Sequence, residues 1–304
     1  MITVLSGGVG AARLLRALSH EIDPSELCAV VNVGDDLVLH GLSICPDLDT
    51  ITYTLAGLNN EDLGWGLEGE SWRVMEELAR LGGESWFRLG DRDLATHLYR
   101  TQRLHEGATK TDVTKELCEH WGVRVRLLPA TNDPIATTFE TSQGTLSFQE
   151  YFVQHHHDVA VHAIAVNGIE NAKATNDVLE ALRNAERLVI APSNPLISID
   201  PIVRIPEIRD IVRARRSDVV AISPLVGGVA LKGPADRLLR DMGYAAGCEG
   251  VATFYQDLVG TMIIDEVDRA SAATIERLGV KVKITTTVMA EPANASRLAR
   301  AVLE

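Results

Sequence analysis

The sequence predicts an α/β protein whose core is a Rossmann-like, doubly wound parallel sheet. Three observations support this prediction. Short apolar segments alternate with amphipathic helical segments near both ends of the chain, as expected when helices cover both faces of a parallel sheet. A glycine-rich turn follows the first apolar segment and leads directly into a helical pattern. A stretch between these regions mixes helical and alternating patterns, which indicates a mixed helical and antiparallel insertion.

The first part of the chain has the order strand, turn, helix, strand, helix. Residues 2–6 form a short apolar segment, and residues 11–18 repeat apolar side chains at helical spacing after the glycine-rich turn. Residues 27–33 are a second strand of the buried type. Asp47 can cap a further helix that ends near Gly57.

The middle of the chain is mainly helical and then extended. Helices are expected at 71–81, 93–103 and 111–121, and strands at 123–128 and 135–153. From residue 159 the alternation returns, with strands expected at 159–166, 187–191, 218–223, 261–265 and 281–285, and helices at 175–185, 205–214, 235–242, 270–278 and 293–303. We therefore predict a nucleotide-binding core made of residues 1–58 and 159–304, and an inserted subdomain, residues 59–158, that covers the active site.

Composition excludes several classes of protein. The chain has 304 residues and a formal net charge of −13, so its surface repels nucleic acid on average. It has no apolar stretch long enough to span a membrane and no basic start typical of a signal peptide. The four cysteines form no CxxC pair, which favours reduced thiols in the cytoplasm over a zinc site. A phosphate-bearing ligand would need backbone N–H groups, a few local cations or a divalent metal ion.

The turn Ser6-Gly7-Gly8-Val9-Gly10 is the first candidate for a phosphate site. Glycines allow a phosphate to approach the backbone, and the next helix offers unpaired N–H groups at its start. The turn lacks the Lys-Ser/Thr pair of a P-loop, and Arg13 stands where a dinucleotide fingerprint has a third Gly or Ala. Asn32 ends the second strand in place of a ribose-binding acid, so a nicotinamide oxidoreductase is disfavoured. A tight structural turn remains the alternative.

Three further strand ends carry small polar residues. Asp35 and Asp36 follow Asn32, where they could bind a metal ion or a ribose hydroxyl or form a solvated turn. Ser193 and Asn194 lie between two prolines, and residues 223–228 end with two glycines. Because the carboxyl ends of parallel strands meet at one edge of a sheet, we expect these loops to lie together.

Two acids begin the helix after the second strand. Asp47 is expected to cap that helix, which leaves Asp49, one turn inside, free to face a ligand. The segment 88–93 is a dense charged turn. The tryptophans are expected to serve packing of the core and insertion, and the run 155–157 of three histidines to be a solvated loop.

Together these motifs resemble the 2-phospho-L-lactate transferase family of coenzyme F-420 biosynthesis, whose members act on the deazaflavin precursor Fo. The resemblance covers the whole chain. The segments that carry it are 6–10, 31–32, 43–50 with the sequence SICPDLDT, 89–97 with the sequence LGDRDLATH, 128–134, 192–195, 198–199 and 223–224. Where the family usually has two acids before a proline, this chain has Asn132 and Asp133 before Pro134.

The resemblance implies a function and a set of site residues. The reaction is transfer of a phospho-organic acid from a guanosine diphosphate-linked donor to the terminal ribityl hydroxyl of Fo, with release of GMP and a requirement for Mg²⁺. Asp49 and Arg88 match positions that contact Fo, and we expect Asp49 to act on the attacking hydroxyl and to contact the metal. The nucleotide would be held by Gly7, Gly8, Gly10, Asn32, Ser193 and Asn194.

The sequence leaves some choices open. The alternative function is a non-catalytic, nucleotide-sugar-binding regulatory protein, since related regulators share the glycine-rich start and the Ser-Asn-Pro loop. The segments PDLDT and LGDRD favour the enzyme. The transferred acid could be 2-phospholactate, phosphoenolpyruvate or phosphoglycerate. The resemblance also suggests a homodimer.

Overall fold

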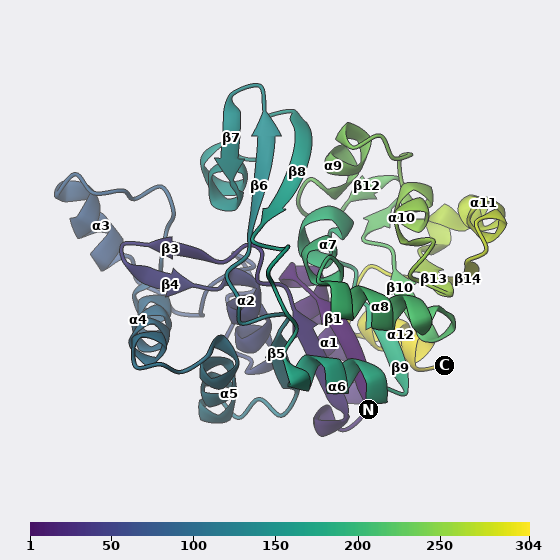
Figure 1. Ribbon diagram of the computed structural model, residues 1–304, viewed down its shortest axis with the longest axis horizontal. Coiled ribbons are helices and arrows are strands. Elements are labelled where there is room, and N and C mark those ends of the chain that lie inside the picture. The colour runs from purple at the N-terminus through teal and green to yellow at the C-terminus, as the bar shows by residue number, and fades with distance from the viewer.

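A computed structural model describes all residues, 1–304, and its centre is a sheet of seven parallel strands in the order β14-β13-β10-β9-β1-β2-β5 (Figure 1). In that order the strands are Lys281–Ile284, Thr261–Ile264, Val219–Ile222, Arg187–Ile190, Ile2–Ser6, Leu27–Val31 and Arg126–Pro129. From β1 the chain progresses through β2 to β5 on one side, and from β9 through β10, β13 and β14 on the other. The order therefore reverses between β1 and β9, which is where doubly wound folds bind ligands.

The central strands are apolar because helices cover both of their faces. Every residue of β2 (LCAVV) and of β10 (VVAI) is buried, as expected for interior parallel strands. Helix α1 (Gly8–Glu21) packs against α2 (Pro46–Leu55) and α12 (Pro292–Leu303), whereas α6 (Asn176–Asn184) packs against α8 (Pro206–Ala214). Figure 1 shows α6 and α8 in front of the sheet and α12 behind it. The predicted fold class is thus confirmed.

A second, three-stranded antiparallel sheet rises from the edge of the core, at the top of Figure 1. Its order is β7-β6-β8, with β6 (Ala136–Thr141), β7 (Gly144–Ser147) and β8 (Val161–Asn167). A π-helical segment, Glu150–Gln154, follows β7. Phe139 and Tyr151 stack with ring centroids 4.2 Å apart and belong to the same hydrophobic core as the main sheet.

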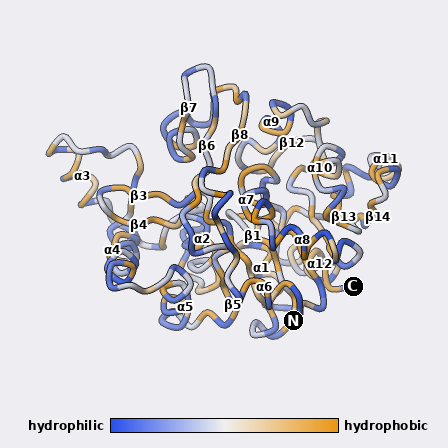
Figure 2. Tube along the Cα trace, viewed as in Figure 1, coloured by the Kyte–Doolittle hydropathy of each residue, from blue (hydrophilic) through white to orange (hydrophobic).

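A peripheral lobe lies beside the core. It contains the hairpin β3 (Leu37–Leu39) and β4 (Leu42–Ile44), with α3 (Arg73–Arg80) and α4 (Asp91–His105). Ile44, Met75 and Leu89 form a small hydrophobic cluster separate from the main core. In Figure 2 hydrophilic colour prevails over α4 and over α5 (Lys110–His120), which suits helices with one face in solvent.

The remaining elements are short and lie mainly after the switch in strand order. They are α7 (Asp200–Val203), α9 (Ala235–Asp241), α10 (Cys248–Tyr255), α11 (Ala272–Arg277), β11 (Leu225–Val226) and β12 (Val229–Ala230), with 3₁₀ turns at Pro24–Glu26, Arg216–Asp218 and Glu266–Ser271 and a second π-helical segment at Pro195–Ile199.

Two strands belong to a different sheet from the one that the predicted division assigns them to. β5, within the predicted insertion 59–158, is an edge strand of the main sheet and pairs with β2. β8, assigned to the resumed core from 159, pairs with β6 in the antiparallel sheet. Of the stretch 135–153, expected to be extended, the part up to Ser147 forms β6 and β7, whereas Glu150–Gln154 is the π-helical segment; α10 was not predicted. Strand pairing depends on partners distant in the chain, so local patterns cannot assign it. The division into a core and an inserted subdomain stays a prediction.

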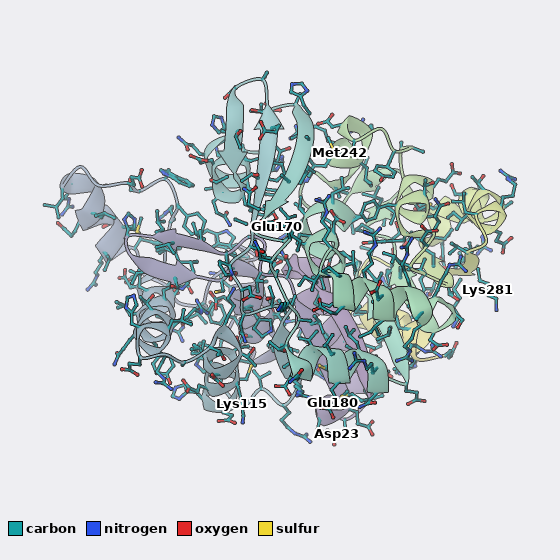
Figure 3. The ribbon with its side chains drawn as sticks, in the orientation of Figure 1. Asp23, Lys115, Glu170, Glu180, Met242 and Lys281 are labelled. Carbon is teal, nitrogen blue, oxygen red and sulfur yellow. The ribbon has the colours of Figure 1, made fainter.

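The helices, the cysteines and two of the lysines can be compared with what the composition predicted. None of the helices combines the length and hydrophobicity needed to cross a membrane. All four cysteines are free and buried. Figure 3 shows Lys115 on α5 and Lys281 on β14 at distant flanks of the molecule, so these two positive charges do not gather into one patch.

Candidate functional site

The glycine-rich turn links β1 to α1 without any intervening loop. β1 ends at Ser6 and α1 begins at Gly8, whose φ of +70° lies in the region that favours glycine. A β-carbon on Gly10 would stand 2.2 Å from the carbonyl oxygen of Pro192, and one on Gly7 would stand 2.7 Å from Asp47 Oδ2. Gly7 and Gly10 are therefore required by close packing of the protein itself, in addition to any ligand.

Asp47 faces the glycine-rich turn and does not cap its own helix. Cys45 precedes α2 at the cap position, while Asp47 Oδ1 accepts a hydrogen bond of 2.6 Å from the backbone N–H of Gly8. Its other oxygen accepts one of 2.9 Å from Asn32 Nδ2. The predicted capping role is wrong because β1 and the start of α2 lie next to each other only in the folded sheet.

Asn32 ties two buried acids together. Its Nδ2 contacts Asp47 Oδ2 at 2.9 Å and Asp35 Oδ1 at 3.3 Å, and its Oδ1 accepts from Gly34 N at 2.9 Å. Burial raises the pKa of Asp47 to about 6. Burial, with the nearby Asp47 and Asp36 carboxylates, raises the pKa of Asp35 well above its usual range. Asn32 is almost fully buried, so its role in this structure is to hold the side chains of Asp35 and Asp47 in place.

A first cavity, here called the glycine-loop cavity, has a volume of about 430 Å³. It gathers the loops that follow β1, β9 and β10, which confirms the expectation that these strand ends meet. Its lining includes Gly7, Gly8, Gly10, Arg13, Asp35, Asp47, Ser193, Asn194, Ser223, Pro224, Lys232 and Gly233. Ser193 Oγ donates to the carbonyl oxygen of Gly7 at 2.7 Å, and Asn194 Oδ1 accepts from Leu196 N at 3.0 Å. Ser193 thus joins its loop to the glycine-rich turn, whereas Asn194 stabilises the start of the segment that follows it.

A second cavity, here called the aromatic cavity, has a volume of about 340 Å³ and lies between α2, α4 and the peripheral lobe. Asp49 and Arg88 both line it, as do Tyr53, Trp65, Trp86, Phe87, Asp93 and His97. The Arg88 guanidinium lies 4.3 Å from the ring centroid of Trp72. Trp65 and Trp86 were expected to serve packing only. The structure corrects that expectation, since both side chains line the cavity. Their neighbours in the sequence gave no sign of this position.

A buried network of charges forms the floor of the aromatic cavity. Arg100 Nη1 donates to Asp49 Oδ2 at 3.1 Å and Nη2 donates to Oδ1. His97 Nδ1 lies 3.7 Å from Asp49, and His97 Nε2 lies 3.3 Å from Asp93 Oδ2. Tyr53 donates to Asp93 Oδ1 at 2.6 Å. Burial raises the pKa of Asp49, although Arg100 and His97 act in the opposite direction.

Sequence reasoning missed three members of this network. Asp93, His97 and Arg100 received no role, although the first two lie in the segment LGDRDLATH. Their spacing along α4 puts all three on one face of the helix. The available signal in the sequence was the spacing of an acid, a histidine and an arginine on one face of a predicted helix.

Two sets of side chains have the oxygen or nitrogen atoms that a metal ion needs. Asp49, Asp93 and His97 offer atoms within 4.8 Å of one another. Arg100 already supplies a positive charge to Asp49 there, which disfavours a cation. Asp35 and Asp47 lie beside the glycine-rich turn and have no ion-pair partner, whereas Asp36 pairs with Lys110. Carboxylate oxygens suit Mg²⁺, so the second pair fits that ion better.

The cavities adjoin each other. Pro46, Gln149 and Val153 line both the glycine-loop cavity and the aromatic cavity. Pro46 and Asp49 belong to the same helix, α2. The protein therefore offers two neighbouring binding sites, one rich in backbone and small polar groups and one rich in aromatic rings.

Comparison with known proteins covers the whole chain. The model of the family described as 2-phospho-L-lactate transferase CofD matches residues 2–299. A phosphoenolpyruvate transferase of Mycolicibacterium smegmatis is 41% identical over 321 residues, which cover 100% of this chain and 98% of that protein. One of Kitasatospora aureofaciens is 40% identical over 309 residues, covering 99% and 96% respectively.

A solved structure shares the fold. The crystal structure of a UPF0052 family member from Bacillus halodurans matches with a TM-score of 0.68 and covers 100% of this chain and 98% of that one. At 19% sequence identity this similarity speaks for the fold alone.

Proposed function

Because this chain belongs to the 2-phospho-L-lactate transferase CofD family and is a transferase, we propose that it moves a phospho-organic acid from a guanosine diphosphate-linked donor to the terminal ribityl hydroxyl of Fo. GMP is the leaving product, and the reaction belongs to coenzyme F-420 biosynthesis. The observation that carries the proposal is the pair of adjoining cavities. One suits a diphosphate and the other suits a flat ring system, and they share a wall at Pro46, Gln149 and Val153.

The glycine-loop cavity has the properties of a donor site. The start of α1 provides the positive end of the helix dipole and backbone N–H groups, of which that of Gly8 already donates to Asp47. This matters in a protein of net charge −13, whose surface repels a diphosphate. Gly7, Gly10, Asn32, Ser193 and Asn194 shape this site through the contacts described above, in keeping with the nucleotide-binding role proposed for them.

The aromatic cavity has the properties of an acceptor site. Trp65, Trp86 and Phe87 offer ring faces to a tricyclic deazaflavin, since stacking is favourable for flat aromatic ligands. Arg88 lies at the wall of the cavity and Asp49 at its floor. This arrangement supports the assignment of both residues to Fo.

The proposed reaction is a substitution at phosphorus. The ribityl oxygen forms a bond to the phosphorus that carries the acid, while the bond from that phosphorus to the bridging oxygen breaks and its electron pair leaves with GMP. We propose that Asp49 accepts the hydroxyl proton. A carboxylate has about four lone-pair positions, so it can hold Arg100 and still accept a proton. Arg100 and His97 would fix its orientation.

We propose that Mg²⁺ is required, with Asp35 and Asp47 as its protein ligands in preference to Asp49. Both acids line the glycine-loop cavity and neither has a cationic partner. The ion would neutralise the negative charge of the diphosphate.

The names of the relatives bear on the transferred acid. Proteins about 40% identical over almost the whole chain are called phosphoenolpyruvate transferases. On this basis we propose enolpyruvate as the acid that the donor carries here.

Free, buried cysteines agree with a cytoplasmic protein. We also propose a homodimer, for which light scattering should give twice the 33.0 kDa of one chain.

Incubation with Fo, Mg²⁺ and guanosine diphosphate-linked enolpyruvate tests the function directly. Mass spectrometry should show equal amounts of GMP and of a phosphodiester of Fo. Binding of GDP by calorimetry without any turnover of the enolpyruvate, phospholactate or phosphoglycerate donor would instead favour the nucleotide-sugar-binding regulator.

A further inference from the structure

A third, small cavity connects the two proposed substrate sites. This junction cavity has a volume of about 100 Å³. It shares Val9, Arg13 and Met289 with the glycine-loop cavity. It shares Thr50, Trp65 and Gly66 with the aromatic cavity. A group bound between the two larger sites can therefore reach it, although those sites also adjoin directly at Pro46, Gln149 and Val153.

The lining of the junction cavity includes several polar side chains, two of them arginines. Arg13 and Arg16 reach it from α1, and Thr54 and Asn59 add a hydroxyl and an amide. Glu61 is the one acid of the lining. At about 100 Å³ the cavity is too small for a guanine or a deazaflavin, but it is of the size of a small charged group.

The two arginines differ in their partners. Arg16 Nη1 forms an ion pair of 2.8 Å with Glu61 Oε1, and that pair is largely exposed to solvent. Arg13 lies one turn earlier on α1, is half-buried, and takes part in none of the ion pairs of the structure. An unpaired guanidinium that lines both the glycine-loop cavity and the junction is a site for an anion.

We propose that Arg13 binds the carboxylate of the transferred acid and so determines that the donor must carry a carboxylate. The inference rests on the proposed function. The phosphorus that carries the acid must lie where the two larger cavities meet, because the acceptor hydroxyl reaches it from the aromatic cavity. The acid attached to that phosphorus can then extend within the glycine-loop cavity toward Arg13, which lines both that cavity and the junction cavity. A planar guanidinium matches a carboxylate with two parallel hydrogen bonds.

A second reading is that Arg13 binds the diphosphate. Arg13 also lines the glycine-loop cavity, so this reading predicts that GDP affinity depends on Arg13. The carboxylate assignment predicts that GDP affinity does not, because GDP carries no acid group. Measurements with and without the carboxylate therefore separate the two readings.

The experiment compares two donors on the full chain with Fo and Mg²⁺. One donor carries enolpyruvate and the other carries its carboxamide, in which the negative charge is removed. Arg13→Gln should raise KM for the carboxylate donor roughly 10- to 100-fold, as for loss of a charged hydrogen-bonded pair, and change kcat/KM for the carboxamide donor less than about threefold. GDP affinity by calorimetry should stay within about twofold, and Arg13→Lys should restore part of the preference.

Arg16→Gln is the matched control. It removes the same charge from the same helix, but its guanidinium already pairs with Glu61. The preference for the carboxylate donor should survive this change. Equal losses on both donors for Arg13→Gln, a large loss of GDP affinity, or a greater loss of preference for Arg16→Gln would each overturn the assignment. Failure of the proposed function looks different, since the wild-type protein would then form no phosphodiester from either donor.

Discussion

At the scale of single residues, buried charges decide the chemistry of this protein. Asp49, Asp93, His97 and Arg100 form one connected network below the aromatic cavity. Asp35 and Asp47 form a second network with Asn32 beside the glycine-rich turn. Each carboxylate would be costly to bury alone, so each depends on its partners.

Asp49→Asn should lower kcat by roughly 10²-fold or more, because loss of a general base typically costs about 10²–10⁴-fold. The change should also lower the thermal midpoint, since it leaves the buried guanidinium of Arg100 without a charged partner. We would measure kcat with saturating Fo and follow unfolding by circular dichroism. Near-normal kcat in a variant with a lowered midpoint would show that Asp49 only holds Arg100.

Glu106→Gln is a suitable control for that experiment. Glu106 is an exposed acid at the end of α4 and lines neither large cavity. Its removal should leave kcat unchanged.

Arg88→Ala should differ from both variants, raising KM for Fo with a smaller effect on kcat, since Arg88 lies at the wall of the aromatic cavity.

Asp47 should make stability depend on pH. Burial raises its pKa from 3.8 in the reference state to about 6 in the folded protein. Between these values the folded state binds more protons than the unfolded state, so the free energy of unfolding falls as pH rises from about 4 to about 6. In EDTA the wild type should lose roughly 1–3 kcal/mol over this window relative to Asp47→Asn. Urea unfolding at a series of pH values measures the difference, and parallel curves would contradict the shifted pKa.

At the scale of elements, the junction of β1, α1 and the loop after β9 holds the site together. Gly10 packs against the carbonyl oxygen of Pro192, and Ser193 donates to Gly7. Asn32, which follows β2, and Asp47 of α2 reach the same place, where Asp47 accepts from both Gly8 and Asn32. Four segments that are distant in the sequence therefore share one small volume, and a change of backbone position in any of them moves the others.

Gly10→Ala should destabilise the protein more than Gly8→Ala. The added methyl group at Gly10 would lie 2.2 Å from Pro192 O, whereas at Gly8 the nearest atom, Asp47 Oδ1, would be 3.8 Å away. At Gly8 the cost comes from its φ of +70° and is about 1–2 kcal/mol. Thermal midpoints and GDP calorimetry on both variants test this order. Since close packing requires Gly10, weaker GDP binding in Gly10→Ala does not by itself report on a phosphate contact.

At the scale of the whole molecule, the negative net charge of the protein opposes binding of an anionic donor. A chain of net charge −13 must accept a donor that carries a diphosphate. In the proposed reaction the start of α1 and a divalent cation provide the local positive potential for the diphosphate, and Arg13 provides it for the carboxylate of the acid. Anion binding should thus depend on a few positive groups at the site.

Removal of divalent cations should abolish turnover. Activity should be lost in excess EDTA and restored by Mg²⁺. Mg²⁺ should also raise the thermal midpoint of the wild type without substrates, by the linkage between binding and folding. Asp47→Asn should lose this shift, whereas Asp49→Asn should retain it. Retention of the shift in Asp47→Asn and its loss in Asp49→Asn would move the metal to the network below the aromatic cavity. Full turnover in EDTA would exclude a metal requirement.

Local sequence alone predicted most of the elements. Apolar runs such as LCAVV and helical spacing such as that of residues 11–18 depend on neighbours in the chain, and both appear in the structure as β2 and α1. The same reasoning placed the loops after β1, β9 and β10 at one edge of the sheet, because parallel strands all point the same way. Fold class and the site of the glycine-loop cavity were therefore determined by the sequence.

Tertiary structure decided which partners those elements meet. The pairing of β5 with β2 and of β8 with β6 joins residues far apart in the chain, so local sequence patterns cannot predict it. The same holds for Asp47, which bonds to Gly8 in place of capping α2, and for Arg100, which reaches Asp49 from another helix. The pKa of a buried acid and the partner of an arginine depend on distances in space. Only the folded chain, by bringing α1, α2 and α4 together, sets those distances and so creates the two adjoining cavities.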